Sequence, residues 1–209
     1  MSFIEKLHWR YAVKKFDANQ KLSAEQLTFI KEAIRLTPSS FGLQPFKVLV
    51  IQDQALKDKL KPASWNQSQI SDCSELFVFT SLIDFSFDHV NQHMQNLSST
   101  REVPLESLEG YKKTIHGFMH KMNDLERENW ISKQIYIALG NMMAAAAAEG
   151  VDVCPIEGFE KHLYDDILNL SSLGLKSVVS AAVGFRAADD KYQFVKKVRK
   201  SGEDLFVTI

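Results

Sequence analysis

The sequence contains one long helical pattern, Trp130–Glu149 (WISKQIYIALGNMMAAAAAE). Apolar residues recur at helical spacing on one side and small or apolar residues fill the other, namely Ile131, Ile135, Ala138, Leu139, Met142, Met143 and Ala146 against Ile137, Gly140, Ala144, Ala147 and Ala148. A helix that is apolar on every side is buried. We therefore expect a buried central helix, which either forms the spine of the core or contacts a second subunit.

Shorter elements are predicted on both sides of this helix along the chain. Phe3, Ile4 and Leu7 have helical spacing, and Ser23 to Gln26 form a capping box at the start of a second helix that ends before Pro38. Polar helices and a loop are expected between residues 84 and 129. Buried strands are predicted at Phe46–Ile51, Leu76–Leu82 and Val178–Phe185, with an apolar terminal strand at Leu205–Ile209 that needs a partner to be ordered.

These elements favour the α+β class. The strands are few, they do not alternate regularly with helices, and no G-x-G-x-x-G motif is present, so a doubly wound dinucleotide-binding domain is excluded. We expect helices packed on a small, mixed, mostly antiparallel sheet. A chain of 209 residues is suited to a single domain spanning residues 1–209.

Composition excludes several classes of function. The formal net charge is −1, so no global field favours nucleic acid or an anionic membrane, and any phosphate site must be local. No segment has the ~20 apolar residues of a membrane span, and the first ten residues lack the apolar core of a signal peptide. Cys73 and Cys154 form no disulfide framework, which is typical of reduced thiols in a cytoplasmic protein.

Two distant segments carry the chemistry. Cys154–Phe159 is predicted to be an extended, apolar turn that can press backbone N–H groups against a flat aromatic ligand. Arg10–Asp17 supplies cations that can hold an anionic tail on the same ligand. A planar ring bearing a phosphate describes flavin mononucleotide (FMN).

Metal-dependent and nucleophilic chemistry are less well supported. Four histidines, His89, His93, His116 and His120, form two pairs at i,i+4 spacing, but no carboxylate lies between them as in a metalloprotease helix. We interpret them as residues of solvated helix faces and expect no metal. No Ser/His/Asp or Cys/His arrangement is visible, and Cys154 is expected to be a small buried apolar residue.

An ordered set of motifs resembles the FMN-dependent nitroreductases, in the branch of oxygen-insensitive nitroreductases and dihydropteridine reductases. The matching residues are Arg10 to Phe16 with Asp17, Thr37 to Ser40, Gln44 to Phe46, Asn66, Trp130 with Lys133 and Gln134, Gly140 with Asn141, Pro155 to Phe159, and Lys197 with Arg199. They follow one order from end to end, so the resemblance covers nearly the whole chain.

The resemblance implies a set of FMN-binding residues. Arg10, Lys197 and Arg199 resemble the family's phosphate clamp, in which planar guanidinium groups bond two phosphate oxygens at once. Tyr11 and Ala12 adjoin this clamp, and Ala12 stands where the family commonly has a hydroxyl residue.

Other implied contacts are with the flavin ring and its side chain. Lys14 and Asn66 would meet the pyrimidine edge, near Gln69, which replaces a lysine of close relatives. Ring-edge or ribityl contacts are implied for Pro38, Ser39, Ser40 and Gln134.

Pro155, Ile156, Glu157 and Gly158 would lie against the ring, with the backbone N–H of Glu157 or Gly158 directed at the reactive nitrogen. No side chain is implied as an acid or base, because the cofactor performs the chemistry. Trp65, Phe41 and Phe118 are the candidates for an aromatic substrate pocket.

The function implied by the resemblance is an oxidoreductase that uses NADH or NADPH to reduce quinones and nitroaromatics by a ping-pong mechanism. It implies a homodimer with two FMN sites at the interface and with Phe206–Ile209 paired to the partner's sheet. The alternatives are a flavin-storage protein with little turnover, a reductase of an enone or a pteridine on the same fold, and a nucleotide-binding interaction module without flavin.

Overall fold

The computed structural model describes residues 1–209. Its strands are β1 (Phe46–Ile51), β2 (Glu75–Leu82), β3 (Asp152–Ile156) and β4 (Leu175–Gly184). Its α-helices are α1 (Phe3–Trp9), α2 (Ala24–Arg35), α3 (Gln54–Ala63), α4 (Ser68–Asp72), α5 (Phe87–Arg101), α6 (Glu109–His120), α7 (Asp124–Ala148), α8 (Lys161–Ile167) and α9 (Gly202–Leu205). Short 3₁₀ turns are η1 (Ser40–Gly42), η2 (Leu105–Leu108), η3 (Leu170–Leu173) and η4 (Lys191–Phe194).

The four strands form one sheet in the order β1-β2-β4-β3, with every neighbouring pair antiparallel. The α+β class is therefore confirmed. The expectation of a mixed sheet is wrong for the single chain, because all of its strand pairs run antiparallel. The three internal strands predicted from the sequence are present within a few residues of their predicted bounds.

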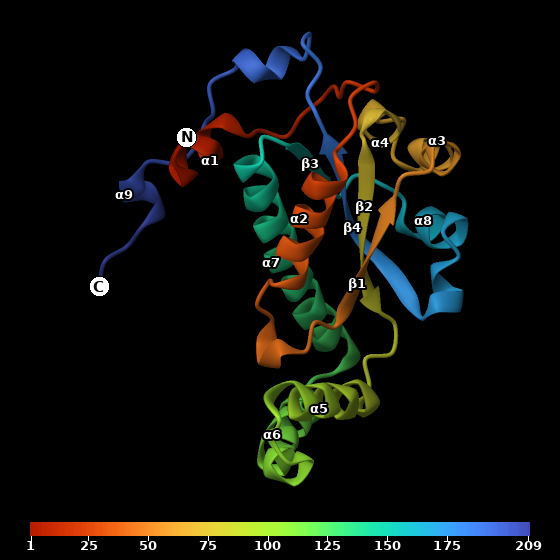
Figure 1. Cartoon of the computed structure of the whole chain (residues 1–209), viewed down its shortest axis with the longest axis vertical. Helices are drawn as coiled ribbons and strands as arrows, with labels where there is room; N and C mark the ends of the chain where they lie inside the picture. Colours follow the sequence, from red (N-terminus) through yellow and green to blue (C-terminus); the bar gives the residue numbers. More distant parts are fainter.

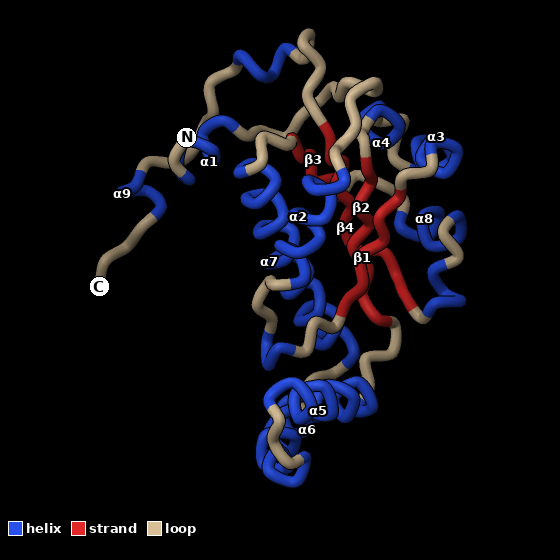
Figure 2. Tube along the Cα trace, viewed as in Figure 1, coloured by secondary structure: helices blue, strands red, loops and turns tan.

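Helices cover both faces of the sheet (Figures 1 and 2). Successive side chains of a strand point to opposite faces. Phe77 and Phe79 of β2 accordingly belong to one buried cluster with α2 and α7, whereas Leu76 and Val78 belong to a second cluster with α3, α4 and α8. Helices α5 and α6 lie together at one end of the molecule, beyond the sheet (Figure 1).

The central helix α7 is buried on one side only. Ile135, Ala138 and Met142 are fully buried, as the sequence predicts. The prediction of burial all round is wrong for the single chain, because Ile137 is 47% exposed and Gly140 also faces solvent. One apolar side of the helix is thus left without a cover.

The fourth strand is a correction to the sequence analysis. The segment expected as a turn, Cys154–Phe159, begins inside strand β3 and leaves it only after Ile156. Strand β3 lies at an edge of the sheet, where Pro155, which has no N–H, removes no ladder hydrogen bond that a neighbour needs.

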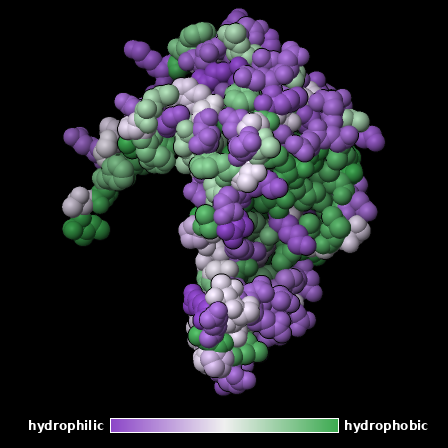
Figure 3. Space-filling view, in the orientation of Figure 1, coloured by the Kyte–Doolittle hydropathy of each residue, from purple (hydrophilic) through white to green (hydrophobic).

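The strand predicted at the end of the chain does not form within the single chain, and its pairing with a partner's sheet stays a prediction. Helix α9 ends at Leu205, and residues 206–209 have no regular secondary structure within the chain. Phe206, Val207 and Ile209 are exposed, and the apolar end of this tail extends away from the body of the molecule (Figure 3). A strand needs a second strand to satisfy its backbone groups, and the chain offers none at this place.

No helix here combines the length and the hydropathy that a membrane crossing requires. The structure contains no group of three or more His, Cys, Asp or Glu side chains arranged to hold a metal. His116 packs instead against the ring of Phe87 at 4.4 Å, and His89 caps the start of α5 through Ser86. Cys73 and Cys154 are free and buried.

Candidate functional site

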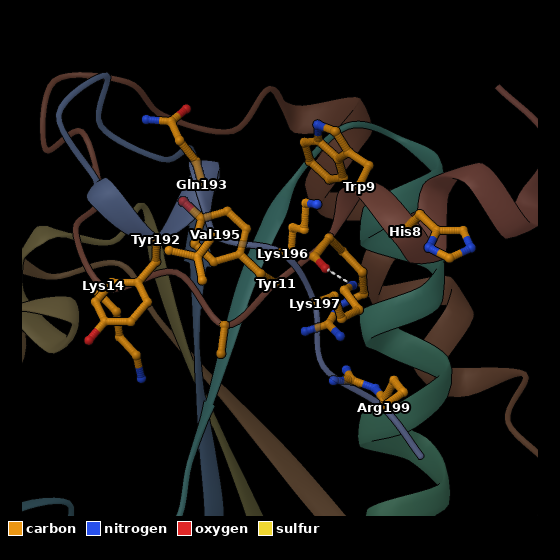
Figure 4. Close-up of a pocket in the computed structure, with 12 residues that line it drawn as sticks. His8, Trp9, Tyr11, Lys14, Tyr192, Gln193, Val195, Lys196, Lys197 and Arg199 are labelled. Carbon is orange, nitrogen blue, oxygen red and sulfur yellow. Dashed lines mark hydrogen bonds between the residues drawn. The ribbon is translucent and has the colours of Figure 1, made fainter. Parts of the chain in front are cut away.

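A cavity of about 380 Å³ lies where the segment after α1 meets the segment after η4 (Figure 4). It is lined by His8, Trp9, Arg10, Tyr11, Ala12, Lys14, Tyr192, Gln193, Val195, Lys196, Lys197 and Arg199. The structure therefore brings together six of the residues predicted from the sequence, although the two segments are separated by most of the chain. The other six lining residues were not predicted.

Three cations of this cavity lie together, and none of them forms an ion pair. Burial, and then the charge of Arg199, lower the pKa of the Arg10 guanidinium. Burial also lowers the pKa of Lys197, and the neighbouring charges of Arg10 and Arg199 lower it further. Burial is the largest cause of both shifts, and the like charges add to it, while the charge of Asp152 acts on the pKa of Arg10 in the opposite direction. Such a cluster is suited to binding an anion.

Lys197 also closes the cavity on one side. Its ammonium donates a hydrogen bond of 2.6 Å to the carbonyl of Leu7 and a second one to the carbonyl of Arg10. These carbonyls belong to the end of α1, where unpaired carbonyl groups and the helix dipole favour a cation. In Figure 4 the side chains of Lys197 and Arg199 lie next to one another on the segment that follows η4.

A stacked arginine supports two of the lining residues. The Arg186 guanidinium lies against the rings of Trp9 and Tyr11, at 4.2 and 4.5 Å from their centroids. It donates hydrogen bonds to the buried carboxylate of Asp152, the shortest of them 2.6 Å. Planar guanidinium groups favour both stacking and a forked contact with a carboxylate. The brace fixes Tyr11 against β3 and β4.

Strand β3 runs beside this cavity. Burial raises the pKa of the Cys154 thiol, while the nearby charges of Lys14 and Arg10 act in the opposite direction. The predicted ring-contacting residues Pro155 and Ile156 therefore lie on the strand that carries this thiol next to the cations.

Beyond β3, Glu157 and Gly158 are held from two sides. The Tyr136 phenol on α7 donates a 2.5 Å hydrogen bond to the Glu157 carboxylate. Gln67 donates a 2.7 Å bond to the carbonyl of Gly158. No backbone hydrogen bond within the chain uses the N–H of Glu157 or of Gly158. Two adjacent N–H groups thus remain available to a ligand.

The turn that carries Trp65 and Asn66 packs on the same segment. Both residues have positive φ, 53° and 57°, which asparagine adopts more readily than most residues but which is strained for a bulky residue such as tryptophan. The Trp65 ring donates a 3.0 Å hydrogen bond to Glu160 and lies so close to Gly158 that a Cβ there would approach it to 2.6 Å. Gln69 is buried on α4, which follows this turn.

The remaining predicted residues form a second, separate group. Gln134 accepts a 2.8 Å hydrogen bond from the N–H of Ser40 and donates one to the carbonyl of Trp130, so its amide is satisfied within the chain. Ser39 accepts a bond from the N–H of Gln44. The Phe41 and Phe118 rings meet edge to face with centroids 5.2 Å apart, and Pro38 is exposed beside them.

A single chain does not join these two groups. The loop after α2, which carries the serines, lies at the opposite end of α7 from α1 (Figure 1). The cation cluster lies at the α1 end. The cation cluster and the serine loop are thus far apart on each chain, whereas Glu157 and Ser40 contact α7 only two residues apart, at Tyr136 and Gln134.

Sequence reasoning missed Asp152, Arg186 and Asp190, which shape the cavity wall from within. Each contacts residues far away along the chain, and such pairs leave no periodic pattern. The Asp189-Asp190 pair in the loop between β4 and η4 was the one available signal.

Comparison with known proteins places the whole chain in one group. Residues 7–185 match the Nitroreductase family. A protein of Staphylococcus aureus (strain bovine RF122 / ET3-1), named "Putative NAD(P)H nitroreductase", is 37% identical over 98% of this chain and 94% of its own length. A Bacillus subtilis (strain 168) protein of the same description is 34% identical over 97% and 95%.

A solved structure supports the fold. The nitroreductase-type protein of Exiguobacterium sibiricum, crystallised in complex with FMN, superposes with a TM-score of 0.86 over 100% of this chain and 98% of its own. Its sequence is 24% identical, so the likeness concerns the fold. On the family match and the relatives' identity, the chain belongs to the Nitroreductase family of oxidoreductases.

Proposed function

We propose that this chain is an FMN-dependent oxidoreductase that uses NADH or NADPH to reduce nitroaromatics and quinones, with one FMN-binding domain spanning residues 1–209. The observation that carries the proposal is the cluster of Arg10, Lys197 and Arg199, which lines a cavity and has no carboxylate partner. An organic phosphate satisfies such a cluster. The FMN complex of the Exiguobacterium protein names a phosphate-bearing ligand for this fold.

The residues present fit FMN at three places. The cation cluster would hold the phosphate. Lys14 and the Asn66 amide would meet the ring edge. The unused N–H groups of Glu157 and Gly158 would donate to the flavin ring at no cost in side-chain entropy. When bound, FMN supplies the redox chemistry, taking a hydride from NAD(P)H and passing it to an acceptor, so that donor and acceptor use the site in turn.

The site is proposed to be completed by a second copy of the chain. Three observations support a homodimer. The cation cluster and the loop that carries Ser39 and Ser40 lie at opposite ends of α7, the apolar side of α7 is exposed at Ile137, and the apolar tail Phe206–Ile209 is exposed. In the dimer the partner would bring Ser39, Ser40 and the Phe41–Phe118 pair to the flavin. The tail would add a strand to the partner's sheet. The two free, buried thiols suit a reducing cytoplasm.

The decisive experiment is the absorption spectrum of the purified protein. We expect oxidised-flavin bands that bleach on addition of NADH or NADPH under nitrogen and return on addition of menadione or a nitroaromatic. Flavin that neither nucleotide bleaches would indicate a storage protein. A colourless protein that ignores added FMN would indicate an interaction module.

Variants test the phosphate assignment directly. Arg10→Ala or Arg199→Ala should raise the dissociation constant for FMN about tenfold or more, because each removes a charge-assisted hydrogen bond. Lys200→Ala, one residue beyond the cavity lining, is the matched control and should change it less than about twofold. Light scattering should give twice the chain's 23.8 kDa. A flavin-loaded monomer would contradict the dimer.

A further inference from the structure

Asp190 is a buried carboxylate that contacts two residues lining the cation cavity, Tyr11 and Tyr192. It was not predicted from the sequence. Only 2% of the residue is exposed. It follows β4 and precedes η4, so it lies between the last strand and the segment that carries Lys197 and Arg199. We propose that Asp190 is a positioning residue. It holds two cation-bearing segments of the cavity, residues 10–15 (the first arm) and residues 191–199 (the second arm), at the spacing that lets their cations bind one phosphate. The proposal rests on the proposed function.

One carboxylate oxygen of Asp190 holds the first arm, residues 10–15. Its Oδ2 accepts hydrogen bonds from the Tyr11 phenol at 3.0 Å, from the N–H of Lys14 at 2.8 Å and from the N–H of Lys15 at 3.2 Å. Three donors on one oxygen fix the backbone that carries Arg10 and Lys14. Charge-assisted bonds of this kind are stronger than bonds between neutral groups.

The other oxygen holds the second arm, residues 191–199. Oδ1 accepts a 3.0 Å bond from the N–H of Tyr192 and so caps η4. Farther along this arm, the Lys197 ammonium returns to the carbonyls of Leu7 and Arg10. The two arms are thus joined at two places, by Asp190 where the second arm begins and by Lys197 near its end.

The carboxylate does not neutralise the cations that it positions. Asp190 takes part in no ion pair, and the neighbouring Lys15 pairs with Asp189 instead. Burial alone would raise the pKa of Asp190, yet the backbone donors from Lys14, Tyr192 and Lys15 hold it below its usual range. The carboxylate is therefore ionised and satisfied by N–H groups and a phenol, which leaves the arginines free for an anion.

The direction in which Asp190→Asn changes the affinity for FMN distinguishes a positioning role of Asp190 from a purely electrostatic effect of its charge. A buried negative charge near an anion site repels the anion, so its removal alone would tighten FMN binding. Loss of the anchoring bonds lets the arms separate, which weakens binding. Asp190→Asn keeps the side-chain size but replaces one acceptor oxygen by an NH₂ group that faces existing donors. Positioning therefore predicts weaker binding despite the more positive cavity.

The experiment titrates apo-protein with FMN, follows flavin fluorescence, and compares Asp190→Asn with Asp189→Asn. Both variants change the net charge by the same amount at adjacent positions, but Asp189 is exposed and holds only Lys15. We expect the dissociation constant to rise about tenfold or more in Asp190→Asn and by less than about twofold in Asp189→Asn. An unchanged or tighter value in Asp190→Asn overturns the proposal.

The salt dependence of FMN affinity is a second measurement, and a nonspecific loss of structure would not change it in the predicted way. Raising the salt concentration weakens a binding step that depends on charge. If the arms separate, the affinity of Asp190→Asn should fall less with salt than that of the wild type. A uniform loss of affinity with the wild-type salt dependence overturns the proposal.

Should Asp190→Asn fail to fold, Tyr11→Phe removes one donor from Oδ2 and keeps the ring on Arg186. This variant should raise the dissociation constant about threefold. An unchanged value there overturns the proposal. A wild-type protein that does not bind FMN overturns the proposed function itself, which is a distinct result.

Discussion

The phenol of Tyr136 and the carboxylate of Glu157 join the central helix α7 to the end of strand β3 through a hydrogen bond of 2.5 Å. Burial, and then the Glu157 carboxylate, raise the pKa of Tyr136 to about 12. The phenol is therefore a protonated donor throughout the neutral range. The bond turns the Glu157 side chain toward α7 while the backbone N–H groups of residues 157 and 158 stay available.

This bond should matter for the rate of flavin reduction. Tyr136→Phe releases the Glu157 side chain and loosens the backbone beside the ring, so we expect reduction by NAD(P)H to slow about threefold, the effect of one partly exposed hydrogen bond. Stopped-flow bleaching of the flavin measures this rate. In a double-mutant cycle with Glu157→Gln the two effects should not add. Additive effects would mean that the two residues act independently.

Removing one partner of the Arg186–Asp152 pair should destabilise the folded chain strongly, because the Asp152 side chain is only 2% exposed and the remaining charge would be left unpaired. Asp152→Asn leaves the guanidinium charge without its partner and should lower the free energy of unfolding by about 3 kcal/mol. Urea unfolding measures this change. Glu128→Gln is the matched control, since Glu128 pairs with Lys176 at an exposed position and should change stability by about 0.5 kcal/mol or less. Equal effects in the two variants would contradict the role of burial.

The internal strands were predictable because local patterns specify them. Strand β2 lies at the centre of the sheet and is buried on both faces, so it appears in the sequence as a continuous apolar run. Strand β3 was missed because it is short and contains Pro155, which favours a turn in sequence terms. Only its place at the sheet edge makes proline acceptable there. That place depends on the tertiary fold.

The candidate site likewise contains residues that could be predicted from the sequence and residues that could not. Arg10, Lys197 and Arg199 line one cavity in the structure, while their assignment as the phosphate clamp of FMN, which rests on the resemblance, stays a prediction. Asp190 could not be found from the sequence, because it acts on Tyr11 across 179 positions and buried acids are rare. The apolar pattern of residues 205–209 indicates a strand only if a second chain supplies its neighbour.

Gly158 should be required by its contact with Trp65. A Cβ at Gly158 would lie 2.6 Å from the indole, so Gly158→Ala should displace the ring, which is 65% exposed, toward solvent and disturb its hydrogen bond to Glu160. We expect a red shift of tryptophan emission and a loss of about 1 kcal/mol in the free energy of unfolding. In the Trp65→Ala background, Gly158→Ala should leave the free energy of unfolding almost unchanged. A full cost in both backgrounds would locate the strain elsewhere.

Tyr164 should make stability depend on alkaline pH. The residue is fully buried, its hydroxyl lies 2.6 Å from that of Ser64, and burial raises its pKa to about 12. An unfolded tyrosine titrates near about pH 10, so the stabilisation from the neutral phenol is complete below that pH and is lost as the pH rises from 10 toward 12. Wild type should therefore exceed Tyr164→Phe in stability at pH 8 by about 1 kcal/mol and lose this advantage above pH 10. Urea unfolding across this pH range measures the difference in stability. Tyr192→Phe, at an exposed position, is the control, and its difference in stability from the wild type should not change over this range. A constant difference between wild type and Tyr164→Phe would show that the phenol ionises alike in the folded and unfolded chains.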